Sequence, residues 1–429
     1  MASEPPAGQL VPFRWPATWN DSRLLSLLEG SPINCLVFDG AQPAAAEAAR
    51  MAGFAIRDWK ALQAVPIQEV RPDPRRPVTV VSEAHWPHLK PAARAGGDQG
   101  ISGPTGAPWI ESTSWMAKLA ASRAPGKPVW LGFAPPEDFP PADGAYRLAI
   151  TDCSASGARW VIDPGQKLLA GLSSGNSDAR QTWSSIVETL AFFEKRREWK
   201  TYAHDGPLGV ISTFSGTNEF LGTEVLNLAA RRNLLYRIID RSVADQAGFG
   251  GLRALLWVDP ERPPQTLAAK LSGFARQGGL LIVHRNAAQP FKGERALDCP
   301  VSGYELRSLG KGSVAVPLRE WDDPYWLAMD AHNLVSRRHD PVRMFNASSL
   351  WVHYSVPPRP ASGGLIQLVN FTGRPASSVS LRIQFPHKSV AIHTLENGGP
   401  VPLKPELIED IKEYYLPAFS IYAALEVSA

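Results

Sequence analysis

The stretch that decides the fold reads Gly206-Pro-Leu-Gly-Val-Ile-Ser212, and apolar residues at helical spacing follow it over 219–233. A second unit begins with Leu252-Arg-Ala-Leu-Leu-Trp-Val258, continues with helical periodicity over 267–277, and ends in Gly278-Gly279 and Leu280-Leu-Ile-Val283. Apolar runs that alternate with helical periodicity, with glycine where a helix ends, are typical of βαβ units. The stretch 206–284 therefore predicts a parallel α/β domain in the middle of the chain.

Composition places the chain among globular proteins with several domains. Its 429 residues correspond to about two to four domains of ordinary size. Hydrophobic residues make up 44% and charged residues 20%, which excludes an intrinsically disordered chain. The 44 Lys and Arg residues nearly balance the 41 Asp and Glu residues, so no basic surface argues for a nucleic-acid partner.

Neither the N-terminus nor the cysteines indicate secretion. The first residues, Met1-Ala-Ser-Glu-Pro-Pro-Ala-Gly8, lack the basic and apolar regions of a signal peptide, and no run approaches about 18 apolar residues. Cys35, Cys153 and Cys299 are odd in number and far apart, so we expect reduced thiols. We therefore expect a cytoplasmic protein without a membrane partner.

Residues 1–205 alternate short apolar runs with helical stretches. The candidate strands are 11–15, 33–38, 54–58, 78–81, 109–110, 129–133 and 160–162. These runs suit an irregular (β/α)8-type TIM barrel, although an eight-stranded barrel ordinarily needs ~250 residues. The glycine-rich stretch 95–107 is expected to be a loop of the kind that covers a site.

The sequence pattern changes after His284. From Leu350 onward apolar and polar residues alternate, as in Gly364-Leu-Ile-Gln-Leu-Val-Asn370 and Val379-Ser-Leu-Arg-Ile-Gln-Phe385. This alternation, with turn residues between the runs, predicts a small antiparallel β-sandwich. The expected fold class is thus α/β multidomain, with a barrel-like domain at 1–205, an α/β domain at 206–345 and a sandwich at 346–429.

This arrangement resembles the multidomain β-galactosidases of glycoside hydrolase family 42. The likeness is carried by Leu208-Gly-Val-Ile-Ser212, Leu252-Arg-Ala-Leu-Leu-Trp-Val-Asp259, Phe274-Ala-Arg-Gln-Gly-Gly-Leu-Leu-Ile-Val283 and Leu365-Ile-Gln-Leu-Val-Asn-Phe371. In that family a glutamine-amidotransferase-like domain lies between the catalytic barrel and the sandwich and mediates self-association. The resemblance therefore implies a carbohydrate substrate and a homo-oligomer formed through the middle domain.

The catalytic motif of that family is not matched. The family carries its acid/base glutamate in an Asn-Glu pair on a barrel strand, and no such pair occurs before Gly206. The pair Asn218-Glu219 begins a helix of the middle domain instead. Two hypotheses follow: a glycoside hydrolase that uses another pair of carboxylates, or a catalytically inactive barrel that binds saccharide or serves as an assembly scaffold.

Four carboxylates follow predicted strands of the first domain. Catalytic groups of a barrel lie at the carboxyl ends of its strands, and glycoside hydrolysis needs two carboxylates in one cavity. The candidates are Asp39, Glu83, Glu111 and Asp163. Glu111 is the first choice, because Trp109-Ile-Glu-Ser-Thr-Ser-Trp115 combines a carboxylate with hydroxyls and two indoles.

Aromatic side chains near the same strand ends are candidates for contacts with a sugar, since an indole can stack on its apolar face. This set comprises Trp19, Trp86, Trp109, Trp115 and Trp130, together with His85. Each candidate has a structural alternative: such carboxylates also cap helices or form turns, and tryptophans also fill cores.

The remaining patterns indicate no metal and no cofactor. His85-Trp-Pro-His88 places two imidazoles three residues apart without further ligands nearby. The loop Ser212-Thr-Phe-Ser-Gly-Thr-Asn218 precedes a helix, so it could hold an anion on its N–H groups or be capped by Thr217 or Asn218. No nucleophilic cysteine follows a predicted strand of the middle domain, so we do not expect amidotransferase chemistry there.

Overall fold

The computed structural model describes residues 4–19, 21–89, 110–132, 135, 143–347, 349–358, 363–397 and 399–429. The chain forms two compact units. The first comprises residues 1–202 with short returns at 369–375 and 419–422, and the second comprises the rest of the chain from residue 203. The division at residues 205 and 345 that the sequence suggests stays a prediction.

The parallel strands of the first unit form two three-stranded sheets, in the orders β1-β2-β3 and β4-β7-β8. A bridge between Phe13 and Ile162 joins the first sheet to the residues after β8, and a second bridge joins Val65 to Val81. These strands are β1 (Pro12–Trp15), β2 (Cys35–Phe38), β3 (Ala55–Asp58), β4 (Thr79–Val81), β7 (Val129–Leu131) and β8 (Arg159–Trp160). The parallel α/β character is confirmed, whereas the described residues do not show a closed eight-stranded barrel.

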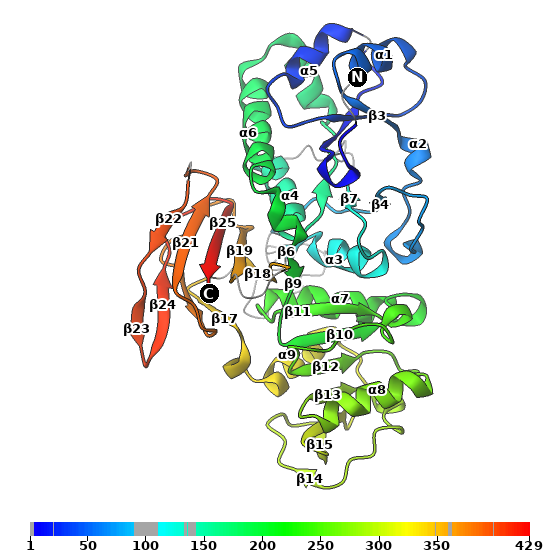
Figure 1. Cartoon of the computed structure of the whole chain (residues 1–429), viewed down its shortest axis with the longest axis vertical. Helices are drawn as coiled ribbons and strands as arrows, with labels where there is room; N and C mark the ends of the chain where they lie inside the picture. Colours follow the sequence, from blue (N-terminus) through cyan, green and yellow to red (C-terminus); the bar gives the residue numbers. More distant parts are fainter. Residues whose placement is uncertain are drawn as a thin grey trace, which may run out of the picture. The chain divides into compact units, whose positions relative to one another are not determined.

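Helices follow most strands of the first unit (Figure 1). They are α1 (Pro43–Met51), α2 (Trp59–Leu62), α3 (Ser114–Arg123), α4 (Asp143–Ala155), α5 (Gln166–Ser174) and α6 (Ser177–Glu194). The sequence predicts one long helix over 181–204, but α6 ends at Glu194 and a 3-10 turn, Arg197–Thr201, follows it. At its start the side chain of Asn176 accepts a hydrogen bond from the backbone N–H of Ala179, which fixes the first turn.

An apolar cluster fills one face of the parallel strands in the first unit. Its members come from β2, β3, β4 and β7 and from neighbouring segments that include the residue after β8, and among them are Cys35, Val37, Ala55, Val80, Trp130 and Val161. Side chains alternate between the two faces of a strand, so residues two positions further along lie on the same face. This alternation decides which side chains continue the apolar face at the carboxyl ends of the strands.

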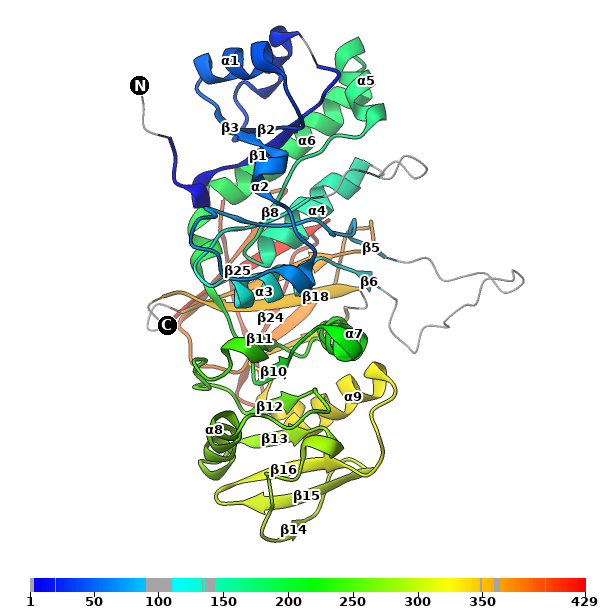
Figure 2. The ribbon, with the colours of Figure 1, turned by 90° about the vertical axis from the view of Figure 1, so that its right-hand side faces the viewer.

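The middle domain is a three-layer α/β structure within the second unit. Its sheet has the order β11-β10-β12-β13-β16-β15-β14, and the first five of these strands are parallel. Figure 2 shows α8 on one face of the sheet and α7 and α9 on the other. The elements are β10 (Leu208–Ser212), α7 (Glu219–Arg231), β11 (Tyr236–Asp240), β12 (Ala254–Trp257), α8 (Gln265–Arg276), β13 (Leu280–Val283), β14 (Ala296–Leu297), β15 (Tyr304–Leu309), β16 (Gly312–Pro317) and α9 (Pro324–Val335).

Two antiparallel sheets account for the last part of the chain, as the period-two alternation predicts. Their orders are β17-β20-β24-β23 and β22-β21-β25-β19-β18-β9. The strands are β9 (Ala203–His204), β17 (Val342–Phe345), β18 (Leu350–Val356), β19 (Gly364–Asn370), β20 (Ser380–Ile383), β21 (Ser389–Thr394), β22 (Val401–Leu403), β23 (Glu406–Ile408), β24 (Ile411–Tyr415) and β25 (Tyr422–Ser428). Among the described helices, none is both long enough and apolar enough to cross a bilayer.

Candidate functional site

Arg14 brings two of the predicted carboxylates together at the carboxyl ends of the parallel strands. Its Nη1 donates to Asp163 Oδ2 over 3.0 Å, and its Nη2 donates to Asp39 Oδ2 over 2.9 Å. Because both carboxylates bind one guanidinium, their bonded oxygens lie at most about 8 Å apart. Carboxylate pairs of glycosidases span about 5 to 9.5 Å, so this separation is compatible with that chemistry.

The strands place these three side chains on the same face as the apolar cluster. Arg14 of β1 is in register with Val37 of β2, which belongs to that cluster. Asp39 lies two positions beyond Val37, and Asp163 lies two positions beyond Val161 of the same cluster. By strand alternation, Arg14, Asp39 and Asp163 therefore lie on the same face as the apolar cluster, beyond its end at the carboxyl ends of the strands. Barrel-type sheets have their sites at these ends.

The two carboxylates differ in their surroundings. Burial raises the pKa of Asp163, the charge of Asp39 raises it further, and Arg14 opposes both effects. The Asp163 side chain is 17% exposed, while that of Asp39 is 44% exposed. The raised pKa of Asp163 suits a proton donor, and Asp39 is the more accessible carboxylate.

One indole packs on Arg14, and we call Arg14, Asp39, Asp163 and Trp59 the Arg14 cluster. The guanidinium of Arg14 lies 4.7 Å from the ring centroid of Trp59, at the start of α2. This contact holds the cation over an indole face and so fixes its orientation.

Tyr146 of α4 packs against Trp86 and lies within the electrostatic influence of Asp163. The hydroxyl of Tyr146 accepts a hydrogen bond from the backbone N–H of Gly165 over 2.8 Å. Burial raises the pKa of Tyr146 to about 12, and the nearby charge of Asp163 acts in the same direction. Trp86 packs edge-on against Tyr146 at 5.0 Å and against Trp160 at 5.2 Å. Among the described indoles that the sequence proposes for sugar contacts, Trp86 thus packs against Tyr146, whose pKa the charge of Asp163 influences.

The motif around Glu111 has a different setting from the one that the sequence suggests. Residues Ile110–Glu111 form β6, a two-residue strand paired antiparallel with β5 (His88–Leu89), so Glu111 lies opposite His88 and outside the parallel sheets. The hydroxyls that follow it point inward to Asp152 of α4. Ser112 Oγ donates over 2.8 Å, and Thr113 donates from its N–H over 2.7 Å and from Oγ1 over 2.9 Å. These hydroxyls therefore stabilise a buried carboxylate at the start of α3.

The other predicted residues are spread over several environments. Glu83 and His85 are exposed, and Trp115 is half-buried on α3. Trp19 and Trp130 are only 4% and 0% exposed, so both rings belong to the core and neither offers a face to a ligand. Trp109 and the stretch 95–107 lie outside the described residues.

A buried carboxylate of the middle domain occupies the loop after β10. Asp259 follows β12 and is fully buried. It accepts hydrogen bonds from Ser212 Oγ over 2.6 Å, Asn218 Nδ2 over 2.6 Å and the backbone N–H of Thr213 over 3.1 Å, and Arg241 pairs with it over 3.0 Å. The loop that could hold an anion on its N–H groups is thus filled by the chain's own Asp259. Asn218 takes part through this contact rather than as a side-chain cap of α7.

Sequence reasoning missed Arg14, Trp59, Asp152 and Asp259. Arg14 lies inside a predicted strand, where a single charged residue is ordinarily expected to face solvent. Its two partners, Asp39 and Asp163, become apparent only when the neighbouring strands are placed beside it. Within the described residues, no three His, Cys, Asp or Glu side chains are grouped as metal ligands.

Comparisons with known proteins give a likeness of fold. No protein-family profile and no curated sequence matches the chain. Among solved structures, α-L-fucosidase isoenzyme 2 from Paenibacillus thiaminolyticus is similar with a TM-score of 0.60 and 10% identity, over 97% of this chain and 98% of that one. The β-galactosidase from Bacillus circulans sp. alkalophilus is similar with a TM-score of 0.53 and 10% identity, over 91% of this chain and 63% of that one.

A rhamnosidase from Novosphingobium sp. PP1Y is similar with a TM-score of 0.51 and 15% identity, over 75% of this chain and 33% of that one. The chain therefore spans almost the whole fucosidase but only part of the other two proteins. The expected likeness to multidomain glycosidases is confirmed at the level of the fold.

Proposed function

We propose that the chain is a carbohydrate-active protein of the glycoside hydrolase type, with its site at the Arg14 cluster. The observation that carries this proposal is the convergence of Asp39 and Asp163 on Arg14 at the carboxyl ends of β1, β2 and the segment after β8. The likeness in fold to a fucosidase, a β-galactosidase and a rhamnosidase supports a carbohydrate substrate.

The roles of the two carboxylates follow from their surroundings. Asp163, whose pKa burial raises, would give its proton to the oxygen of the departing sugar. Asp39 would act as the carboxylate that attacks the sugar carbon or deprotonates a water molecule. Arg14 would position both groups, and the exposed part of Trp59 and Trp86 would contact the sugar ring.

The test is hydrolysis of a panel of aryl glycosides by the Asp163→Asn and Asp39→Asn variants. We expect each variant to lose at least about 100-fold in kcat with its fold intact, the loss typical of removing a positioned acid or base. Glu111→Gln serves as the matched comparison, because Glu111 lies on β6 outside the parallel sheets. A loss confined to Glu111→Gln would transfer the catalytic role to that residue.

A second candidate function is saccharide binding without catalysis, and the ion pairs of Arg14 favour it. A guanidinium that neutralises both carboxylates suits a binding surface as well as a reaction centre. Sugar binding by the wild-type chain without turnover of any glycoside in the panel would support this function. In either case we propose that residues 206–345 form an amidotransferase-like domain that mediates self-association.

A further inference from the structure

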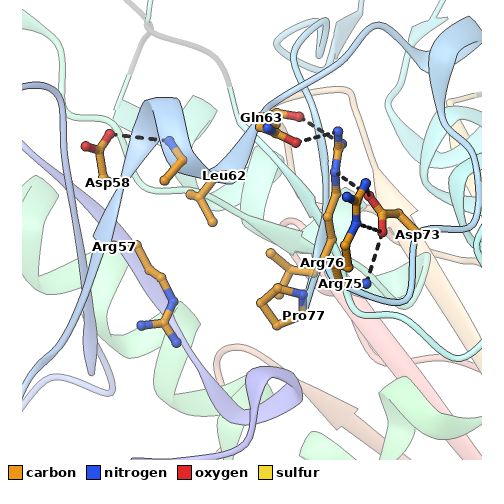
Figure 3. A pocket seen from close by; sticks show the side chains of 10 residues that line it. Arg57, Asp58, Leu62, Gln63, Asp73, Arg75, Arg76 and Pro77 are labelled. Atoms are coloured by element: carbon orange, nitrogen blue, oxygen red, sulfur yellow. Dashed lines mark hydrogen bonds and ion pairs between the residues drawn. The ribbon is translucent and has the colours of Figure 1, made fainter.

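The Arg-rich segment before β4 forms one wall of a pocket that the proposed hydrolysis does not use. The cavity has a volume of about 320 Å³ and is lined by Arg57 of β3, by Leu62 at the end of α2 and Gln63 after it, and by Asp73, Arg75 and Arg76. Figure 3 shows Arg57 on one side and Arg75 and Arg76 on the other, with Leu62 and Pro77 between them. We call this cavity the arginine pocket. Its volume lies at the low end of ligand sites, which suits a small molecule.

The charges of the arginine pocket do not balance. Three guanidinium groups face two carboxylates, Asp58 and Asp73. Asp58 already caps α2 by accepting hydrogen bonds from the N–H groups of Lys60 and Ala61, and Asp73 is shared between Arg75 and Arg76. No carboxylate of the pocket wall therefore pairs with Arg57.

Donor groups in the pocket are left without acceptors. A guanidinium carries five N–H donors. Arg76 donates to the backbone oxygen of Gln63 over 3.1 Å and to its Oε1 over 2.8 Å, while its buried Nε lies 3.5 Å from Asp73 Oδ2 in the ion pair and is not available to a ligand. Arg57 donates to the backbone oxygen of Ile56 over 2.8 Å and to Glu4. An oxyanion would match the remaining donors in pairs.

The contact with Glu4 shows that Arg57 binds a carboxylate. Glu4 lies before β1 and supplies a carboxylate to Arg57, although it is not part of the pocket wall. Its side chain is 48% exposed, so water and solutes can displace it. We propose that the arginine pocket binds a small oxyanion, either the carboxylate of a sugar-sized acid or an inorganic sulfate or phosphate, and that Glu4 competes with this ligand for Arg57.

Calorimetric titration of the full chain with sodium sulfate, sodium phosphate and sodium glucuronate tests this proposal, at constant ionic strength. Glucose is the neutral control. We expect one-to-one binding of at least one anion, and the three titrations decide whether a carboxylate or an inorganic oxyanion is preferred. Arg57→Gln should weaken this binding by about ten-fold, as loss of a charge-assisted contact does.

Glu4→Gln should act in the opposite direction and tighten binding by about two- to five-fold, because it removes the internal competitor. Arg23→Gln is the matched control, since Arg23 is 90% exposed, pairs with Asp21 and lies outside the pocket wall. If Arg57→Gln lowers the melting temperature of the chain, anion affinity is measured on Arg75→Gln instead. The side chain of Arg75 is 89% exposed, so its replacement should leave the fold intact. The proposal is overturned if no anion binds, if Glu4→Gln leaves the affinity unchanged, or if Arg23→Gln weakens binding as much as the pocket variants.

Discussion

Replacing Asp152 by Asn should remove much of the pH dependence of stability in the first unit. Asp152 is fully buried on α4 and accepts hydrogen bonds from Ser112 and Thr113 at the start of α3. Burial raises its pKa from 3.8 to about 6, and the donors and the charge of Lys118 only partly oppose this effect. An Asn at this position keeps the shape and can still accept from the N–H of Thr113, but it carries no charge.

The size and sign of the effect follow from the pKa of Asp152. As pH rises from about 4, the unfolded chain releases this proton first, so the stability that protonated Asp152 contributes is full below pH 4 and is lost by about pH 6. A shift from 3.8 to about 6 corresponds to about 3 kcal/mol. Burial lowers the pKa of Lys118 to about 8, so its own contribution changes above pH 8 and not in this window.

The assay is urea unfolding of wild type and Asp152→Asn at several pH values between 4 and 7. Hydrogen exchange of amides in α3 and α4 assigns the transition to this unit, since a chain with several domains need not unfold in one step. Between pH 4 and pH 6 the free energy of unfolding of wild type should fall by about 3 kcal/mol relative to that of the variant. Asp178→Asn, at an exposed position in α6, is the control. A difference that does not vary with pH would refute the assignment of Asp152 as a buried, titrating acid.

Three further outcomes are expected. Asp259→Ala should destabilise the middle domain by about 3–5 kcal/mol, because the buried donors Ser212 and Asn218 lose their acceptor. Hydrogen exchange in β10 and β12 measures this loss. The control is Glu261→Gln, at a side chain that is 56% exposed, and an equal effect of the two variants would contradict the prediction. Gly312→Ala should lower the melting temperature, since its Cβ would lie 2.2 Å from the backbone oxygen of Gly279, whereas Gly273→Ala in α8 meets no atom within 4 Å and should stabilise by about 0.5–1 kcal/mol. Finally, a thiol reagent should modify Cys299 before the other two cysteines in the native chain, because Cys35 and Cys153 are buried and burial raises the pKa of both thiols. If the Cys299→Ser variant still reacts fast, the reagent reaches the buried cysteines and the prediction is wrong.

The positions of most secondary-structure elements could be predicted from the sequence, because burial on both faces of a sheet leaves a local trace. Leu208–Ser212, Ala254–Trp257 and Leu280–Val283 are strands as predicted, since continuous apolar runs between helical patterns have few other uses in a globular chain. The alternation in Gly364–Asn370 likewise identifies an antiparallel strand. Periodicity does not say which strands pair, because pairing between strands such as β4 and β7 is decided by residues far apart in sequence.

The candidate site shows the same division between local pattern and tertiary contact. The sequence by itself identified Asp39 and Asp163 as carboxylates after strands, and Trp86 as an aromatic residue close to a strand end. Only the tertiary structure decided that Arg14 joins the two carboxylates, that the hydroxyls beside Glu111 serve Asp152, and that Asp259 fills the loop after β10. The physical reason is that ion pairs and buried hydrogen bonds form between side chains separated by 25 to 149 residues, and such partners leave no periodic signal along the chain.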